Sequence, residues 1–137
     1  MKYSIVITES LNNQLKKQLI RKDGQEDLCF ALYNTGTGKE RISAVLNEII
    51  FPTENDRNLH GNVSFNPDFL DRVISNCRSK QMGIIFIHSH PGSGWQNMSL
   101  DDIKAEKELA PRIKAATGYP LVGMTVGNDG SWSGRFW

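Results

Sequence analysis

Apolar and polar residues alternate along this chain with two different periods, which divide it into strands and helices. Apolar residues at every second position predict strands, and those at every third or fourth position predict helices that face a core. Strands are predicted at residues 2–8, 26–33, 40–51, 63–65, 82–88, 121–126 and 132–137. Helices are predicted at residues 9–22, from 67 through 77, and at 99–116, the last with Ile103, Leu109 and Ile113 facing inward. This order predicts an α/β (α+β) fold, in which a mixed, mostly antiparallel sheet is flanked by three helices.

Residues with special backbone preferences mark the ends of these segments. Asn66 and Pro67 form a good helix start, because asparagine caps the first turn and proline fits the first helical position. Gly118 ends the third helix. Residues 34–38 and 52–62 are polar and contain glycines, and they are predicted as a turn and a loop. The tight turn makes the strands before and after it antiparallel.

Length and composition fit one globular domain. The chain has 137 residues, of which 39% are hydrophobic and 23% charged, as is ordinary for soluble proteins. The formal net charge of +1 argues against a nucleic-acid partner or an anionic membrane surface. No apolar run approaches the roughly 20 residues that span a bilayer, and the N-terminus lacks the features of a signal peptide. We expect one domain over residues 1–137, and its end directly after a strand suggests the N-terminal part of a longer protein.

Cysteine usage indicates the redox compartment. Cys29 and Cys77 both lie within apolar patterns, where buried free thiols are favoured over a disulfide. Free buried thiols suit a reducing compartment. We therefore expect a cytoplasmic protein.

The clearest chemical signal follows the apolar run at residues 84–87. His88 and His90 end this strand, and because strand side chains repeat every two residues, both imidazoles face the same side, about 7 Å apart. A short loop leads to Ser99 and Asp102, which have the S-x-x-D spacing of a helix N-cap and the third helical residue. A carboxylate in that first turn is a candidate third ligand. Two histidines, one carboxylate and an open fourth position form a hydrolytic zinc site.

This arrangement, His-x-His-Pro followed by a short loop and Ser-x-x-Asp, resembles the JAMM signature of the JAB/MPN metalloproteases. The order of elements matches over nearly the whole chain, so the resemblance implies the JAB/MPN (cytidine deaminase-like) architecture. It implies that zinc (Zn²⁺) is held by His88, His90 and Asp102. It also implies that Glu26, at the start of an earlier strand, is the general acid–base, and that Ser99 stabilises the oxyanion of the reaction.

The loop between His90 and Ser99 has one residue more than is usual in the family. Counting from His90 places Asp101 at the ligand position, whereas counting from Ser99 places Asp102 there. We choose Asp102, because the helix start sets its spacing from Ser99, while a Gly-rich loop absorbs an extra residue easily. Asp101 would point about 100° away around the helix.

Other residues near these motifs have simpler roles. Ser89 faces away from the two histidines and is expected to be structural. Asp27 is expected to face opposite to Glu26 on the same strand. His60 lies in a polar segment and is expected to be a loop residue. Trp95, in the loop after the second histidine, either anchors that loop or contacts substrate.

The resemblance implies a zinc-dependent peptidase or isopeptidase that cleaves the amide bond after the C-terminus of a ubiquitin or ubiquitin-like protein, in deconjugation or precursor processing. Residues 132–137 and 94–96 also resemble bacterial members found near ubiquitin-like conjugation genes, so an E1-like activating enzyme is an expected partner. Two other interpretations stay open: a zinc amidohydrolase acting on a small or carrier-bound amide, and a non-catalytic MPN interaction module. Some DNA-repair proteins share a similar motif, but the low net charge argues against a nucleic-acid role.

Overall fold

Six strands form one curled, mixed sheet at the centre of the molecule. The computed structural model describes residues 2–60, 62–92 and 99–137, and within these ranges the sheet has the strand order β1-β3-β2-β6-β7-β8. These strands are β1 (Lys2–Val6), β3 (Arg41–Ile50), β2 (Leu28–Thr37), β6 (Gly83–Ser89), β7 (Val122–Val126) and β8 (Trp132–Phe136). The β1–β3 and β6–β7 pairs are parallel, and the other neighbouring pairs are antiparallel. The mixed sheet predicted from the sequence is therefore confirmed.

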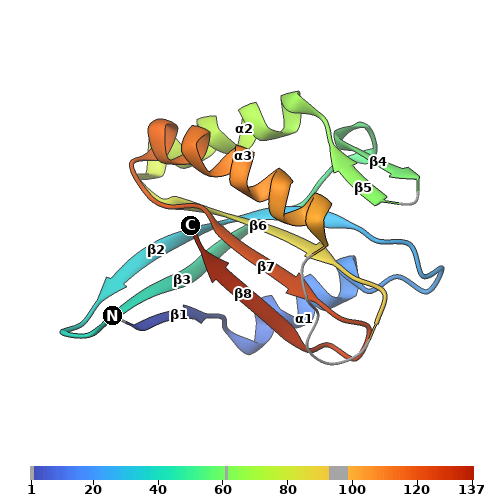
Figure 1. Cartoon of the computed structure of the whole chain (residues 1–137), viewed down its shortest axis with the longest axis horizontal. Coiled ribbons are helices and arrows are strands. Elements are labelled where there is room, and N and C mark those ends of the chain that lie inside the picture. Colours follow the sequence, from blue (N-terminus) through green and yellow to red (C-terminus); the bar gives the residue numbers. More distant parts are fainter. Residues whose placement is uncertain (1, 61, 93–98) are drawn as a thin grey trace.

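Helices cover both faces of this sheet (Figure 1). The helix α1 (Glu9–Leu19) lies on one face, and α2 (Pro67–Lys80) and α3 (Leu100–Thr117) lie on the other. Two of these helices begin at a residue whose side chain caps the first turn. The side chain of Thr8 accepts a hydrogen bond from Leu11 N–H before α1, and that of Ser99 accepts one from Asp102 N–H before α3. The three predicted helices are thus present.

Side chains of the central strand β6 alternate between two cores. Ile85 and Ile87 pack in the core under α1, whereas Ile84 and Phe86 pack against α2 and α3. Every residue of β6 is buried, which explains why its sequence is a continuous apolar run. The same alternation places His88 on the face that α2 and α3 cover.

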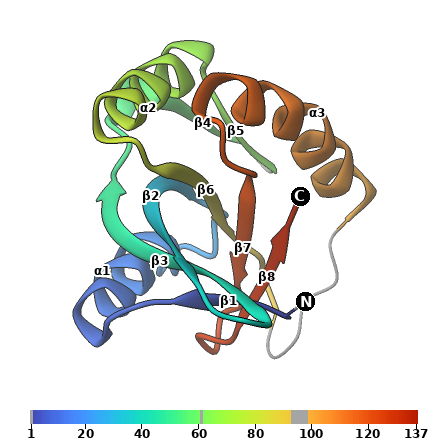
Figure 2. The ribbon, with the colours of Figure 1, turned by 90° about the vertical axis from the view of Figure 1, so that its left-hand side faces the viewer.

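The sheet curls until its two edge strands face each other (Figure 2). The rings of Tyr3 on β1 and Phe136 on β8 have centroids 4.9 Å apart. Gly134 leaves room for Ile5, because a Cβ at Gly134 would lie 2.5 Å from Ile5 Cδ1. A cavity of about 1170 Å³ lies on this concave side and is lined mainly by β1, β8 and the start of α1.

The segment before α2 is more structured than the loop predicted at residues 52–62. It contains a 3-10 turn and a strand that pairs antiparallel with the following one: η1 (Glu54–Asp56), β4 (Arg57–His60) and β5 (Asn62–Phe65). His60 therefore belongs to a strand and not to a loop. The nearly buried Asp56 carboxylate ties this segment to α2 through an ion pair with Arg72 at 2.6 Å. Such a contact between distant residues is not visible in the local polar pattern.

Strand β2 starts later and ends later than the predicted residues 26–33. It continues through the predicted turn at 34–38, because its pairing with β3 extends to Thr37 opposite Ile42. Backbone pairing with a neighbouring strand thus outweighs the turn-like composition of this segment. Glu26 consequently precedes β2 and does not lie on it.

The end of α1, the buried positions of α3 and the two cysteines agree with the sequence predictions in part. The helix α1 ends at Leu19 and not at residue 22. Ile103 is 38% exposed, because it lies in the first turn of α3, whereas Leu109 and Ile113 are buried as predicted. Both cysteines are buried free thiols, as predicted. Among the described helices, none has the length and apolar character required to cross a membrane.

Gly123 on β7 should not tolerate a side chain. A Cβ at this position would collide with the carboxylate of Glu106, which is fully buried and paired with Arg135. We expect Gly123→Ala to lower the free energy of unfolding, measured by urea denaturation, by about 1–3 kcal/mol, as overpacking usually does. Gly36→Ala is the control, because its nearest new contact is an ordinary one, 3.6 Å from Ser43 Cβ. Equal losses in the two variants would contradict this explanation.

Candidate metal centre

Two histidines stand at the C-terminal end of β6, on the face covered by α3. His88 is only 4% exposed, and its ring centroid lies 5.6 Å from that of Phe86. Its Nε2 lies 3.3 Å from Thr125 Oγ1 on the neighbouring β7. His90 follows the strand, its backbone N–H donates to Val126 O at 2.9 Å, and its ring centroid is 5.6 Å from that of His88. The parallel pairing of β6 with β7 therefore sets the positions of both residues.

The first turn of α3 brings a carboxylate to these rings. Ser99 Oγ accepts a hydrogen bond from Asp102 N–H at 3.1 Å, and Asp102 Oδ2 accepts one from Ser99 N–H at 3.3 Å, which completes a capping box. The same Asp102 Oδ2 lies 2.8 Å from His90 Nε2. Asp101 is exposed. The helix start thus turns Asp102, and not Asp101, toward the histidines.

His88, His90 and Asp102 could together hold a metal ion. One potential ligand atom from each residue lies within 4.8 Å of the other two. Two imidazole nitrogens and one carboxylate oxygen are a common donor set of catalytic zinc sites, which keep a further position open. Imidazole is also a good ligand for other divalent transition metals. The donor chemistry and the spacing of these three residues therefore fit the metal that the sequence predicts.

The protonation states of these residues suit metal binding. Burial lowers the pKa of His88 to about 4, so its imidazole is neutral near neutral pH. Burial alone would raise the pKa of Asp102, but the hydrogen bonds that its carboxylate accepts from His90 and Ser99 favour the ionised form, and the net shift of the pKa is downward. Metals bind neutral imidazole and ionised carboxylate, so neither of these two residues must lose a proton first.

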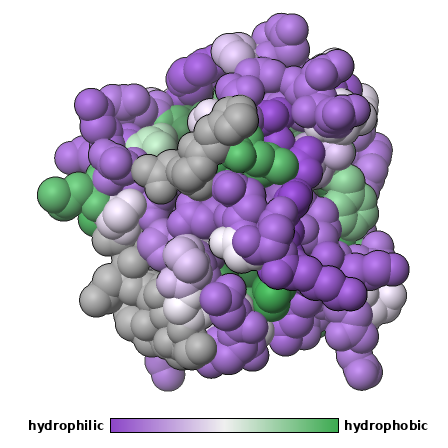
Figure 3. Space-filling view, turned by 90° about the vertical axis from the view of Figure 1, so that its right-hand side faces the viewer, coloured by the Kyte–Doolittle hydropathy of each residue, from purple (hydrophilic) through white to green (hydrophobic). Residues whose placement is uncertain are grey.

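The cluster is partly accessible from the surface through His90 and Asp102. The side chains of His90 and Asp102 are 19% and 25% exposed, while His88 lies deeper. Figure 3 views the molecule from the end of the sheet where β6 and α3 meet, and the described surface at this end is mainly hydrophilic. The large cavity on the concave side is a separate feature, because none of these three residues is part of its described lining.

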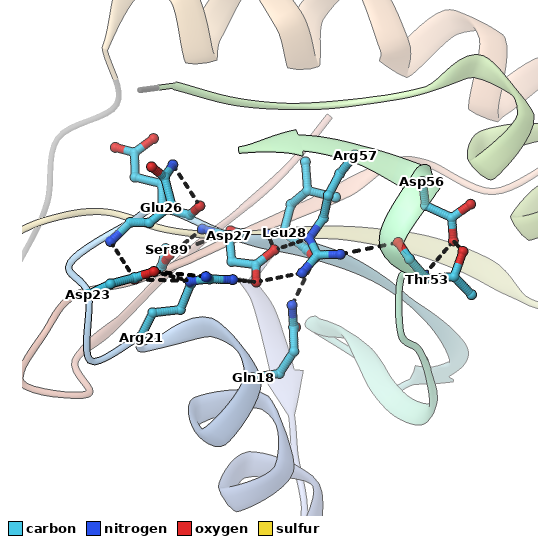
Figure 4. A network of polar contacts seen from close by, with 11 residues as sticks. Gln18, Arg21, Asp23, Glu26, Asp27, Leu28, Thr53, Asp56, Arg57 and Ser89 are labelled. Carbon is cyan, nitrogen blue, oxygen red and sulfur yellow. Dashed lines mark hydrogen bonds and ion pairs between the residues drawn. The ribbon is translucent and has the colours of Figure 1, made fainter. Parts of the chain in front are cut away.

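Glu26 lies beside this cluster, in the segment just before β2. Leu28 at the start of β2 pairs with His88 in β6, so Glu26 comes next to the end of β6. The backbone N–H of Val63 on β5 is close enough to the Glu26 carboxylate to interact with it. Figure 4 shows that the side chains of Glu26 and Asp27 point in different directions, as predicted, although neither residue lies on the strand.

The surroundings of Glu26 change its acidity. Burial has the largest influence and raises the pKa of its carboxyl group. Interaction with His90 lowers this pKa and interaction with Asp102 raises it, so Glu26 lies near both residues. The net effect is a raised pKa of Glu26. A higher pKa brings this carboxyl group closer to neutral pH, where a general acid–base must both take up and release a proton.

Glu106, which was not predicted from the sequence, forms a polar cluster behind the histidines with Arg135 and Trp137. Glu106 is fully buried, pairs with Arg135 and accepts a hydrogen bond from Trp137 Nε1–H at 2.9 Å. Its Oε2 lies 4.0 Å from His88 Nε2. The spacing of four residues from Asp102, which puts both carboxylates on one face of α3, was the signal that could have indicated Glu106.

The remaining predicted residues have different outcomes. Trp95, predicted to anchor its loop or contact substrate, lies outside the described residues. Ser89 is buried, and its Oγ accepts a hydrogen bond from Asp27 N–H at 3.0 Å, so its structural role agrees with the prediction. Ser99 caps α3 through the hydrogen bonds described above.

Comparisons with known proteins do not assign the chain to a family. No protein-family model matches it, and no curated protein matches its sequence. Conclusions about its chemistry therefore depend on the geometry of the residues described above.

The choice between the two neighbouring aspartates can be tested by metal content. We expect about one zinc per chain in the wild type and in Asp101→Asn after reconstitution, and much less in Asp102→Asn. The reason is that Asp102→Asn replaces a charged ligand by a neutral amide, and two imidazoles alone do not hold zinc tightly. Elemental analysis of protein purified without chelator gives the measurement.

Two results would contradict these assignments. Loss of zinc in Asp101→Asn together with retention in Asp102→Asn would show that the wrong aspartate was chosen. Less than about 0.2 zinc per chain in the reconstituted wild type would remove the metal centre itself, since catalytic sites of this donor set bind one ion.

Proposed function

We propose that this chain is a zinc-dependent amide hydrolase of the JAB/MPN type, which cleaves the peptide or isopeptide bond after the C-terminus of a ubiquitin-like protein. The observation that carries the proposal is the meeting of His88, His90 and Asp102, with ligand atoms within 4.8 Å of one another, beside the Glu26 carboxylate. The JAB/MPN (cytidine deaminase-like) architecture is part of the same proposal. A mixed sheet with helices on both faces is compatible with it.

In this proposal His88, His90 and Asp102 hold the zinc ion through two nitrogens and one oxygen. When bound, the ion supplies Lewis acidity and makes a water molecule acidic enough to act as a nucleophile near neutral pH. The protein contributes a neutral His88, whose ring is packed against Phe86 and next to Thr125. These neighbours restrict the ring to one orientation, which a metal ligand requires.

Glu26 moves the proton in this proposal. Its carboxylate accepts the proton that the attacking water loses and passes it to the nitrogen of the leaving amine. The raised pKa of Glu26 favours this second step, because a carboxyl group with a higher pKa holds the proton longer near neutral pH. The interaction with Val63 N–H favours a position of this carboxylate beside β5.

Ser99 is suited to stabilise the negative charge that develops on the substrate oxygen. Its Oγ accepts a hydrogen bond from Asp102 N–H, and a hydroxyl group that accepts one bond can still donate its own hydrogen. Ser99 is exposed at the N-terminus of α3, where the helix dipole also favours negative charge. A donor placed there would lower the energy of the tetrahedral intermediate.

An extended C-terminal tail is the form of substrate that suits the surroundings of Glu26. Within the described residues β5 pairs only with β4, so its other edge presents backbone groups. Val63 on that strand already contacts Glu26. A tail that added to this edge would be held by backbone hydrogen bonds beside the catalytic carboxylate. An E1-like activating enzyme, which acts on such tails, is the proposed partner, and two buried free cysteines support a reducing, cytoplasmic setting.

Replacing Glu26 by glutamine tests the enzymatic role. Glutamine keeps the size and the hydrogen-bond acceptor but cannot take up the proton. We expect zinc content and melting temperature near those of the wild type, and a fall of roughly 10²- to 10⁴-fold in hydrolysis of a ubiquitin-like fusion or lysine conjugate. The measurement is a paired cleavage assay of the wild type and Glu26→Gln, both loaded with zinc.

The control for this assay is Glu108→Gln, which changes an exposed glutamate on α3 in the same chemical way. It should leave hydrolysis unchanged. Equal activity of Glu26→Gln and the wild type would remove Glu26 from the mechanism. Zinc-loaded wild type that cleaves none of several ubiquitin-like substrates would instead support a hydrolase of small amides or an interaction module.

A further inference from the structure

Asp27, the neighbour of Glu26, is the centre of a buried polar network (Figure 4). Its side chain points into a group of arginines, whereas that of Glu26 points away from this group. Asp27 is 1% exposed, so its carboxylate is almost completely removed from solvent. A buried carboxylate requires partners, and the origin of these partners shows which parts of the chain the network connects.

Two arginines and one backbone amide bind the Asp27 carboxylate. Arg57 on β4 donates from Nε to Oδ1 at 2.5 Å and from Nη2 to Oδ2 at 3.1 Å. Arg21, which follows α1, donates from Nη1 to Oδ2 at 3.3 Å. Leu28 N–H donates to Oδ1 at 2.8 Å. The bidentate contact with Arg57 fixes the orientation of the carboxylate as well as balancing its charge.

The backbone of Asp27 is bonded to the residue that lies between the two histidines. Asp27 N–H donates to Ser89 Oγ at 3.0 Å, and Ser89 N–H donates to Asp27 O at 3.0 Å. Ser89 separates His88 from His90 along the chain. These two bonds therefore hold the backbone next to Glu26 at a set distance from the proposed metal ligands.

Arg57 connects the same network to the hairpin that contacts Glu26. Its Nη1 donates to Thr53 O at 3.2 Å, and its strand β4 pairs with β5, which contains Val63. Val63 N–H in turn interacts with the Glu26 carboxylate. Asp27 is thus tied to the backbone that carries Glu26 and to the hairpin that contacts its carboxylate.

We propose that Asp27 is a positioning residue that acts through Glu26: with Ser89 and Arg57 it holds the Glu26 carboxylate beside the metal ligands. This inference rests on the proposed function, in which Glu26 moves the proton. Stability alone does not explain a buried ion pair at this place, because desolvation of the two charges offsets much of their attraction. Directional hydrogen bonds that one carboxylate accepts from two strands and a loop do explain it, because an apolar side chain could not orient these parts of the chain.

Hydrogen exchange of the metal-free protein tests the proposal without any activity. In Asp27→Asn the bidentate contact with Arg57 loses its negative charge. We therefore expect Val63 N–H to exchange at least about tenfold faster, measured by NMR, because local opening of the hairpin controls its exchange. Glu106→Gln is the matched control, because Glu106 is also a buried, ion-paired carboxylate, but its partner Arg135 is on β8 and not in the β4–β5 hairpin. It should leave Val63 exchange near that of the wild type. Unchanged exchange in Asp27→Asn, or equal acceleration in both variants, would overturn the proposal.

Kinetics of the zinc-loaded protein provide a second test. Asp27→Asn should lower kcat by roughly 10- to 100-fold, the effect of misplacing a catalytic group by about 1 Å. Zinc content should stay near that of the wild type, because no proposed ligand changes. In the Glu26→Gln background the same substitution should have little further effect on kcat, because the proton carrier is already absent. Equal fold-losses in both backgrounds would indicate general damage and overturn the positioning role.

Arg57→Gln keeps the proposal testable if Asp27→Asn folds poorly. This variant leaves Asp27 bound to Arg21 and to Leu28 N–H, and it should give a smaller loss of kcat with the same dependence on Glu26. Unchanged kcat and unchanged Val63 exchange in Arg57→Gln would overturn the proposal that the Asp27–Arg57 contact positions Glu26. If the wild type cleaves no ubiquitin-like substrate, the proposed function fails, while Val63 exchange still decides whether Asp27 positions Glu26.

Discussion

The burial of β6 between β2 and β7 is the constraint on which the rest of the structure depends. Every residue of this strand is buried, so polar groups at its end must find partners in the protein or in a ligand. His88 and His90 lie where the strand leaves the core. Thr125 on β7 and Asp102 on α3 are the neighbours that approach them. The candidate metal centre therefore lies at this end of the sheet because the central strand ends there.

Two buried ion pairs flank the histidines. Glu106 and Arg135 join α3 to β8, and Asp27 and Arg57 join the segment before β2 to the β4–β5 hairpin. Pairs of this kind contribute little net stability, but their hydrogen bonds are directional and hold the connected elements in one arrangement. A site assembled from several elements needs such support, because its chemistry depends on side chains being held within a fraction of an ångström.

The proposed metal ligands could be predicted from the sequence because their spacings are local. The alternation of a strand puts two histidines on one face, and the helix cap sets which of two aspartates turns toward them; the structure places Asp102 2.8 Å from His90. Predictions were wrong where backbone pairing with the next strand decides the local structure. Residues 34–37 have the composition of a turn but continue β2 along β3, and the predicted loop at 52–62 contains β4 because β5 pairs with it.

By itself, the sequence determined the order along the chain of the three helices and of the six strands in the central sheet, the burial of β6 and the shared face of His88 and His90, because these features follow from local periodicity. Only the tertiary structure decided that Glu26 lies beside the histidines, because its position depends on the pairing of β2 with β6 and on a backbone donor from β5. It also decided the partners of the two buried carboxylates. Asp27 and Arg57 are 30 residues apart in the chain, and Glu106 and Arg135 are 29 apart, so nothing local relates them, and each pair meets only when the sheet and its helices have assembled.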